Sequence, residues 1–125
     1  MSRQNVELLR GLFAAYNARD IEELISHCDQ SIEFRSAFAA VGGAVYQGHD
    51  GMRSWHRDFE DVGGDEIRLE PEVLFDLGEH TLALYVLHGR GRGSGVEVAM
   101  PSALVARWRD GLMVHAKAYA TGKTR

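Results

Sequence analysis

The spacing of apolar residues in the first quarter of the chain predicts two helices joined by a short corner. Over residues 5–19, apolar side chains recur three and four positions apart, which places them on one face of a helix. That face consists of Leu8, Leu9, Leu12, Phe13 and Tyr16. Asn5 is a suitable N-cap for this helix. Asp20 is suitable for a second helix over residues 21–27, because Glu23 follows it at the spacing of a capping box. The two helices are expected to form a helical hairpin.

A third helix is predicted over residues 49–62, and strand patterns dominate the rest of the chain. The apolar stripe of this helix consists of Met52, Trp55, His56 and Phe59. Segments that alternate or are rich in Val, Leu and aromatic residues predict strands at 31–36, 65–77, 80–92, 95–109 and 112–120. Residues 37–48 are small and include glycines, so they are expected to form a loop or a short edge hairpin. The Asp110-Gly111 pair favours a tight turn between the last two strands.

This order, with helices early and strands late, favours an α+β fold in which helices cover one face of a curved antiparallel sheet. The 125 residues and 13.9 kDa fit a single domain over residues 1–125. The apolar runs are too short for a membrane span of about 20 residues. The lone Cys28 excludes an internal disulfide and a multi-cysteine zinc site. With one thiol and no hydrophobic leader pattern, the chain is expected to be cytoplasmic.

Charge is distributed unevenly along the chain. The net charge is −4, which disfavours nucleic acid as a partner, because proteins that bind polyanions usually carry a basic excess. Residues 1–79 hold 16 acidic and 7 basic side chains, whereas residues 80–125 hold 2 and 7. The basic second part has two interpretations. It forms solvated polar edges on the late strands, or it forms a cationic mouth that favours an anionic ligand.

Four segments together resemble the nuclear transport factor 2-like superfamily and, within it, the SnoaL-like proteins. They are Phe13–Asp20 at the helix corner, Ser31–Phe34, Tyr46–Met52, and Trp108–Gly111 at the last hairpin. The resemblance covers nearly the whole chain. It implies a cone in which a curved sheet wraps around a pocket that the three helices of the N-terminal half close. It also implies a homodimer formed through the outer face of the sheet.

Matching the strands to ketosteroid isomerase within this superfamily gives a set of residues expected to face the pocket. On the strands they are Phe34, Ser36, Leu82, Leu84, Val86, His88, Arg90, Ser102, Leu104, Ala106 and Trp108. On the helices they are Leu12, Tyr16, Trp55, His56 and Phe59. The outward-facing set, suited to a partner surface, is Tyr85, Leu87, Val105, His115 and Tyr119. Since side chains alternate along a strand, a slip of one residue inverts each assignment.

The candidate chemistry of this pocket depends on histidine and tyrosine. The positions that match the acid and base groups of ketosteroid isomerase hold Leu12, Ser36 and Leu104, so that activity is not expected. His56 or His88 could act as a general base, because an imidazole titrates near neutral pH, with Tyr16 as an oxyanion donor. No cofactor and no metal ion is expected.

Two alternatives to an enzyme remain open. In the first, the cone binds a small apolar or anionic molecule without converting it. In the second, the outer sheet face forms a dimer and has little further role. The sequence names neither the ligand nor the reaction.

Overall fold

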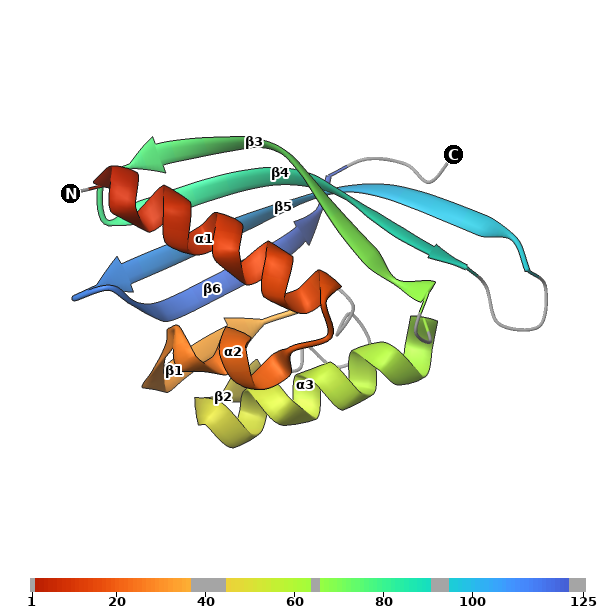
Figure 1. Cartoon of the computed structure of the whole chain (residues 1–125), viewed down its shortest axis with the longest axis horizontal. Coiled ribbons are helices and arrows are strands. Elements are labelled where there is room, and N and C mark those ends of the chain that lie inside the picture. The colour runs from red at the N-terminus through yellow and green to blue at the C-terminus, as the bar shows by residue number, and fades with distance from the viewer. Residues whose placement is uncertain (1, 37–44, 64–65, 91–94, 122–125) are drawn as a thin grey trace.

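A computed structural model describes residues 2–36, 45–63, 66–90 and 95–121, and the expected elements all appear in it (Figure 1). The helices are α1 (Ser2–Asn17), α2 (Ile21–Ser26) and α3 (Gly48–Gly63). The strands are β1 (Cys28–Arg35), β2 (Val45–Gln47), β3 (Arg68–Leu77), β4 (His80–Arg90), β5 (Glu97–Arg109) and β6 (Leu112–Ala120). The short β2 pairs with β1 as an edge hairpin. The remainder of the expected loop, residues 37–44, lies outside the described residues.

The two N-terminal helices begin differently from one another. Asp20 caps α2 as predicted, because its carboxylate accepts a hydrogen bond from the backbone N–H of Glu23 at 3.2 Å. The expected cap at Asn5 is wrong, since α1 begins at Ser2 and Asn5 lies inside it. The Asn5 side chain instead donates to the carbonyl of Gly78, in the turn between β3 and β4. Asn5 therefore ties the start of α1 to the sheet.

The six strands form one curved sheet in the order β2-β1-β6-β5-β4-β3. Strands β3 to β6 are a meander of antiparallel hairpins, as predicted. Asp110 and Gly111 both adopt positive φ at the last turn, which is the conformation of a type I′ hairpin. Strand β1 runs parallel to β6, so the sheet is mixed at that position. The expected α+β cone is confirmed.

The three helices cover one face of this sheet, here called the inner face. Helix α1 packs against β3 and β4, and α3 packs against β1 and β2, with α2 between α1 and α3 (Figure 1). The inner-facing side chains of both helices, such as Leu9 and Met52, are buried. Removing this apolar surface from water is the main source of stability for the fold. The core therefore lies between the helices and the inner face.

The register of β4 against β5 decides which of their residues reach that core. Tyr85 lies opposite Ser102, so odd-numbered residues of β4 share a face with even-numbered residues of β5. Tyr85 and its neighbours on that face are buried under α1, and the ring of Tyr85 lies 5.1 Å from that of Phe13. The even-numbered residues of β4, Leu82 to Arg90, consequently point to the outer face.

Candidate functional site

An apolar cavity of about 80 Å³ lies between the inner face of the sheet and the helices. Its helical wall consists of Leu9, Leu12, Phe13, Tyr16, Leu24, Met52, Trp55 and Phe59. Its wall on the sheet side consists of Phe34, Ser36, Leu69, Tyr85, Leu104, Met113, Ala116 and Ala118. Within the described part of the chain, no charged residue belongs to this wall. An uncharged apolar lining is typical of sites that bind small molecules through hydrophobic contact.

Aromatic rings form much of the cavity wall and pack against one another. Trp55 is at the centre, with its ring 5.3 Å from Phe59 in a stacked arrangement and 5.2 Å from Phe34 in an edge-to-face arrangement. The Tyr16 ring lies 5.9 Å from Trp55 and 5.8 Å from Phe59. These separations fall in the range of favourable aromatic pairs. The wall beside α3 is therefore held in place by ring packing.

Ionic groups approach the cavity wall at the hydroxyl of Tyr16. This hydroxyl donates a hydrogen bond to Oε2 of Glu60 at 3.1 Å, and Nε of Arg19 lies 3.7 Å from Oε1 of the same carboxylate. Arg19 also donates to the backbone carbonyls of Tyr16 and Ile67. Burial and the nearby Glu60 carboxylate raise the pKa of Tyr16 well above its usual range. Tyr16 is therefore a neutral phenol whose proton is held by Glu60.

His56 lies beside the ring of Tyr16. Its ring lies 6.0 Å from Tyr16 and 6.3 Å from Trp55. The Nε2 atom of His56 is buried and has no hydrogen-bond partner among the groups that the structure describes. Buried side-chain nitrogens are nearly always hydrogen-bonded in folded proteins, so an unpaired one needs an explanation. Tyr16, Arg19, His56 and Glu60 are called the polar corner below.

Several of the expected pocket residues do meet at the cavity. They are Leu12, Tyr16, Phe34, Ser36, Trp55, Phe59 and Leu104. They come from α1, α3, β5 and the segment around β1, so the cone brings together positions far apart in the chain. His56 belongs to the polar corner beside the cavity and is not part of its wall.

The expected orientation of β4 is wrong, because its odd-numbered residues are the ones buried against the helices. Leu84, Val86, His88 and Arg90 lie on the outer face, and Tyr85 and Leu87 lie on the inner face. His88 hydrogen-bonds to Oε1 of Glu70 through Nε2 at 2.8 Å on that outer face. The sheet therefore separates His88 from His56 and Tyr16, and the three do not converge.

Outer-face charges at the end of β4 are also paired. Arg90 donates to Oε1 of Glu97 at 3.1 Å, and both side chains are exposed. This ion pair does not belong to the cavity. The expected cationic mouth therefore gains no support from Arg90.

Two further expected residues face inward but have structural partners. The Ser102 hydroxyl donates to the carbonyl of Met100 at 3.1 Å. Nε1 of Trp108 donates to Oγ1 of Thr81 at 2.9 Å in a buried hydrogen bond. Neither residue contributes to the cavity wall. They stabilise the sheet beneath α1.

Glu60 is the functional candidate that sequence reasoning missed. It follows His56 by four positions on α3, so the two share one side of the helix. Arg57, Asp58 and Asp61 nearby are charged, which is typical of a solvated side of a helix. The spacing from His56 was the available signal. Asp58, two positions earlier, instead accepts a hydrogen bond from the Tyr46 hydroxyl at 2.8 Å on the exposed surface.

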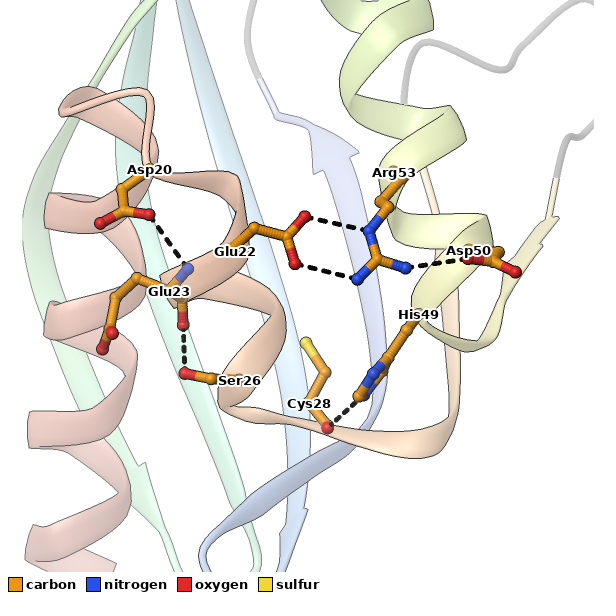
Figure 2. A network of polar contacts seen from close by, with 8 residues as sticks. All are labelled: Asp20, Glu22, Glu23, Ser26, Cys28, His49, Asp50 and Arg53. Atoms are coloured by element: carbon orange, nitrogen blue, oxygen red, sulfur yellow. Dashed lines mark hydrogen bonds and ion pairs between the residues drawn. The ribbon is translucent and has the colours of Figure 1, made fainter.

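A second polar cluster joins α2 to α3 away from the cavity (Figure 2). Arg53 donates to both carboxylate oxygens of Glu22, at 3.0 and 2.9 Å, and to Asp50 at 2.8 Å. His49 contacts the carbonyl of Cys28 through Nε2 at 2.9 Å. Burial raises the pKa of the Cys28 thiol to about 12, so this thiol stays protonated. The cluster links two helices, and none of its residues belongs to the wall of the apolar cavity.

The fold and cavity define a protein of the nuclear transport factor 2-like class. Residues 9–116 match the model of the SnoaL-like domain family, so the chain belongs to that family. A search of curated protein sequences gave no match.

Solved structures show the same fold at low identity. One is a nuclear transport factor 2-like protein of unknown function from Burkholderia pseudomallei, with 19% identity over 94% of this chain and 91% of that chain and a TM-score of 0.84. Another is TerC, co-crystallised with polyporic acid, with 20% identity over 94% and 92% and a TM-score of 0.84. A third is described as a SnoaL-like polyketide cyclase from Jannaschia, with 15% identity over 94% and 85% and a TM-score of 0.80.

In the described part of the chain, none of the helices is long and apolar enough to cross a membrane. Nor does that part contain a cluster of three His, Cys, Asp or Glu side chains that could hold a metal ion.

Proposed function

We propose that the protein binds a small, uncharged and largely apolar molecule in the cavity. The observation that carries this proposal is the uncharged wall, in which six aromatic rings and several aliphatic side chains surround about 80 Å³ of space. An engineered apolar cavity of about 150 Å³ admits benzene. The cavity here is about half that volume, so a ligand of the size of benzene fits once the wall moves outward. The wall offers no cation for an anionic ligand within the described residues, so the apolar alternative is the stronger one.

One structural neighbour supports the binding of a small molecule by this fold, although not an uncharged one. TerC was crystallised with polyporic acid, which is a small molecule, and it shares this fold. The likeness gives the fold alone, so the identity of the ligand for this chain depends on its own cavity.

The single buried thiol, Cys28, fits the expected cytoplasmic location.

Titration with benzene tests this proposal. The indole N–H signal of Trp55 is followed by NMR, because Trp55 lies in the cavity wall. We expect saturable shifts in the native protein and their loss in Ala118→Leu, which fills the cavity from β6. The matched control is Lys117→Leu, which adds the same side chain at the next position on the opposite face of the sheet. If benzene leaves the Trp55 signal unchanged in the folded native protein, the proposal is wrong.

Catalysis is a second candidate, and the unpaired Nε2 of His56 favours it. His56 would take a proton from carbon next to a ligand carbonyl, and Tyr16 would donate to the enolate oxygen. That role requires the Tyr16 proton to leave Glu60. Deuterium incorporation into cyclopentanone in D₂O measures such enolisation. His56→Ala should remove any incorporation and His88→Ala, on the outer face, should leave it unchanged. Absence of incorporation in the native protein would exclude this candidate.

We also propose that the outer face of the sheet forms a homodimer. Its centre carries Leu82, Leu84 and Val86 opposite Val105, Ala103 and Pro101 of β5. Val73 and Phe75 extend this face over β3 and are largely exposed. Contiguous exposed apolar surface on a soluble fold marks an interaction site.

Sedimentation at micromolar concentration tests the dimer. Leu84→Asp places a charge at the centre of the face and should give a monomer. Val96→Asp places the same charge at an exposed position before β5 and should leave the dimer intact. A native protein that sediments as a monomer would rule out this surface as a dimer interface.

A further inference from the structure

The direction of one hydrogen bond at the cavity wall limits which ligands the cavity can recognise. Tyr16 lines the cavity, and its hydroxyl donates its only proton to Oε2 of Glu60 at 3.1 Å. A carboxylate has no proton to give back, so the phenol oxygen retains lone pairs that can only accept. Burial and the Glu60 charge also raise the pKa of Tyr16, so the phenol does not ionise. The Tyr16 oxygen is therefore available as an acceptor and not as a donor.

The neighbouring imidazole strengthens this limit. Nε2 of His56 is buried beside the Tyr16 ring and lacks a partner among the described residues. In one tautomer Nε2 accepts a hydrogen bond, and in the other it donates one. A ligand hydroxyl that reached Nε2 from the cavity would satisfy either tautomer, since it both donates and accepts. A ligand carbonyl can satisfy only one of the two and cannot pair with the Tyr16 oxygen at all.

The remaining groups of the polar corner hold Glu60 in this orientation. Nε of Arg19 lies 3.7 Å from Oε1, which leaves Oε2 for the Tyr16 proton. Arg19 itself is fixed by hydrogen bonds to the carbonyls of Tyr16 and Ile67. Its guanidinium carbon lies 4.9 Å from the centre of the Tyr16 ring. The carboxylate is thus clamped between a fixed cation and a buried phenol.

We infer that Glu60 is a specificity-determining residue, which makes the cavity select a small apolar molecule bearing a hydroxyl group over the same molecule bearing a carbonyl. This inference rests on the proposed function, because it requires the cavity to take a ligand. Glu60 acts through Tyr16 and does not itself touch the ligand. The ligand class is a compact apolar alcohol or phenol whose hydroxyl donates to the Tyr16 oxygen.

Cyclopentanol and cyclopentanone form a matched pair of probes, since they have the same ring and differ in the oxygen group. Their dissociation constants are measured by NMR titration of the Trp55 indole signal, with benzene as an apolar reference. In the native protein we expect cyclopentanol to bind about five- to tenfold more tightly than cyclopentanone, the effect of about one hydrogen bond.

Glu60→Gln tests the role of the carboxylate directly. Arg19 holds the amide oxygen at the Oε1 position, so the NH₂ group faces Tyr16 and donates to its oxygen. The phenol proton then becomes free to donate to a ligand carbonyl. We expect cyclopentanol and cyclopentanone then to bind about equally, or cyclopentanone to bind more tightly, with benzene affinity unchanged. A merely structural role for Glu60 would change both probes equally.

Two control variants test whether the effect comes merely from removing a carboxylate charge or from removing any tyrosine hydroxyl. Asp58→Asn removes the same charge from the same helix, at a carboxylate bound to Tyr46 outside the cavity wall, and should keep the native preference. Tyr46→Phe removes a tyrosine hydroxyl that donates to a carboxylate of the same helix outside the cavity wall, and should also keep the preference. Tyr16→Phe should abolish the preference.

The outcomes distinguish the inference from the proposed function. Equal affinities for the two probes in the native protein, or a native preference retained in Glu60→Gln, would overturn the role of Glu60 while cavity binding stands. A preference lost in Tyr46→Phe would show that the effect does not come from the tyrosine in the cavity wall, and would also overturn it. If none of the three probes moves the Trp55 signal, both proposals fall together.

Discussion

Two arginine–carboxylate clusters attach α3 to the N-terminal part of the chain. They differ in ion-pair distance, in exposure to solvent and in their position relative to the cavity. In the α2–α3 cluster, Arg53 reaches Glu22 and Asp50 at 2.8 to 3.0 Å (Figure 2). In the polar corner, Nε of Arg19 lies 3.7 Å from Oε1 of Glu60. Judged by distance alone, the α2–α3 cluster has the stronger ion pairs.

Exposure reverses this order. Asp50 is fully exposed and the Glu60 side chain is 25% exposed, so water screens the first cluster far more than the second. The polar corner also includes a buried phenol and an imidazole nitrogen without a partner, and it borders the cavity. The short ion pairs of the exposed cluster therefore indicate a structural link between two helices. Burial and unsatisfied hydrogen-bonding capacity beside a cavity identify the candidate site.

The largest expected difference between the clusters comes from removing the Tyr16 side chain. Tyr16 is almost fully buried and packs against Trp55, His56 and Phe59. Tyr16→Ala should lower the free energy of unfolding by about 3–5 kcal/mol, measured by urea denaturation. Tyr16→Phe, which keeps the ring, should lose about 1 kcal/mol. Similar losses in the two variants would show that ring packing does not hold the corner together.

The second-largest effect is expected at high pH, where ionisation of Cys28, beneath the α2–α3 cluster, should destabilise the folded protein. Burial raises the pKa of Cys28 from 9.0 to about 12, so only the unfolded chain loses the thiol proton between these values. Stability from this group is intact below pH 9 and is lost as the pH rises to 12, by up to about 4 kcal/mol. Tyr85, whose pKa burial raises to about 12, adds to the same loss. Urea denaturation at pH 8 and pH 10.5 should show a smaller decline in Cys28→Ser than in the native protein. Equal declines would mean that the thiol is accessible.

Removing each arginine in turn compares the clusters directly. Arg19→Ala removes the hydrogen bonds to the carbonyls of Tyr16 and Ile67 and the ion pair with the Glu60 carboxylate. The expected loss of unfolding free energy is about 1–3 kcal/mol. Arg19→Lys keeps the charge but not the fork of donors, and should recover only part of that loss. Full recovery by lysine would show that charge alone matters there.

The smallest effect is expected for Arg53→Ala. Its partners are exposed, so the shift in the urea midpoint should be smaller than for Arg19→Ala and should vanish in 1 M salt. Arg53 lowers the pKa of Glu22, so the contribution of this pair is present above the unfolded pKa of Glu22 and is lost as the pH falls. A midpoint shift that equals that of Arg19→Ala and persists in salt would contradict the comparison.

The fold could be predicted from the sequence because its signals are local. The helical spacing in α1 and α3 and the Asp110-Gly111 turn each specify a structure over a few residues. The orientation of β4 could not be predicted, because both of its faces are apolar. Leu82, Leu84 and Val86 alternate with Ala83, Tyr85 and Leu87, so alternation does not show which set is buried.

The candidate site was predictable in part for a related reason. Tyr16, Trp55 and Phe59 belong to regular helical stripes, and the stripe determines which side faces the core. Glu60 lies at the border of its stripe among charged neighbours, where the sequence alone favours solvent. Its partner Tyr16 is 44 positions away, so only the packing of α1 against α3 brings the pair together.

The most direct test of the account follows both arginines in one NMR titration with cyclopentanol. The Nε–Hε signals of Arg19 and Arg53 report on the polar corner and on the α2–α3 cluster, respectively. The account predicts that the Arg19 signal shifts in step with that of Trp55, while the Arg53 signal stays in place. A shift of Arg53 without a shift of Arg19 would contradict it, because the ligand would then bind at the exposed cluster and not in the cavity.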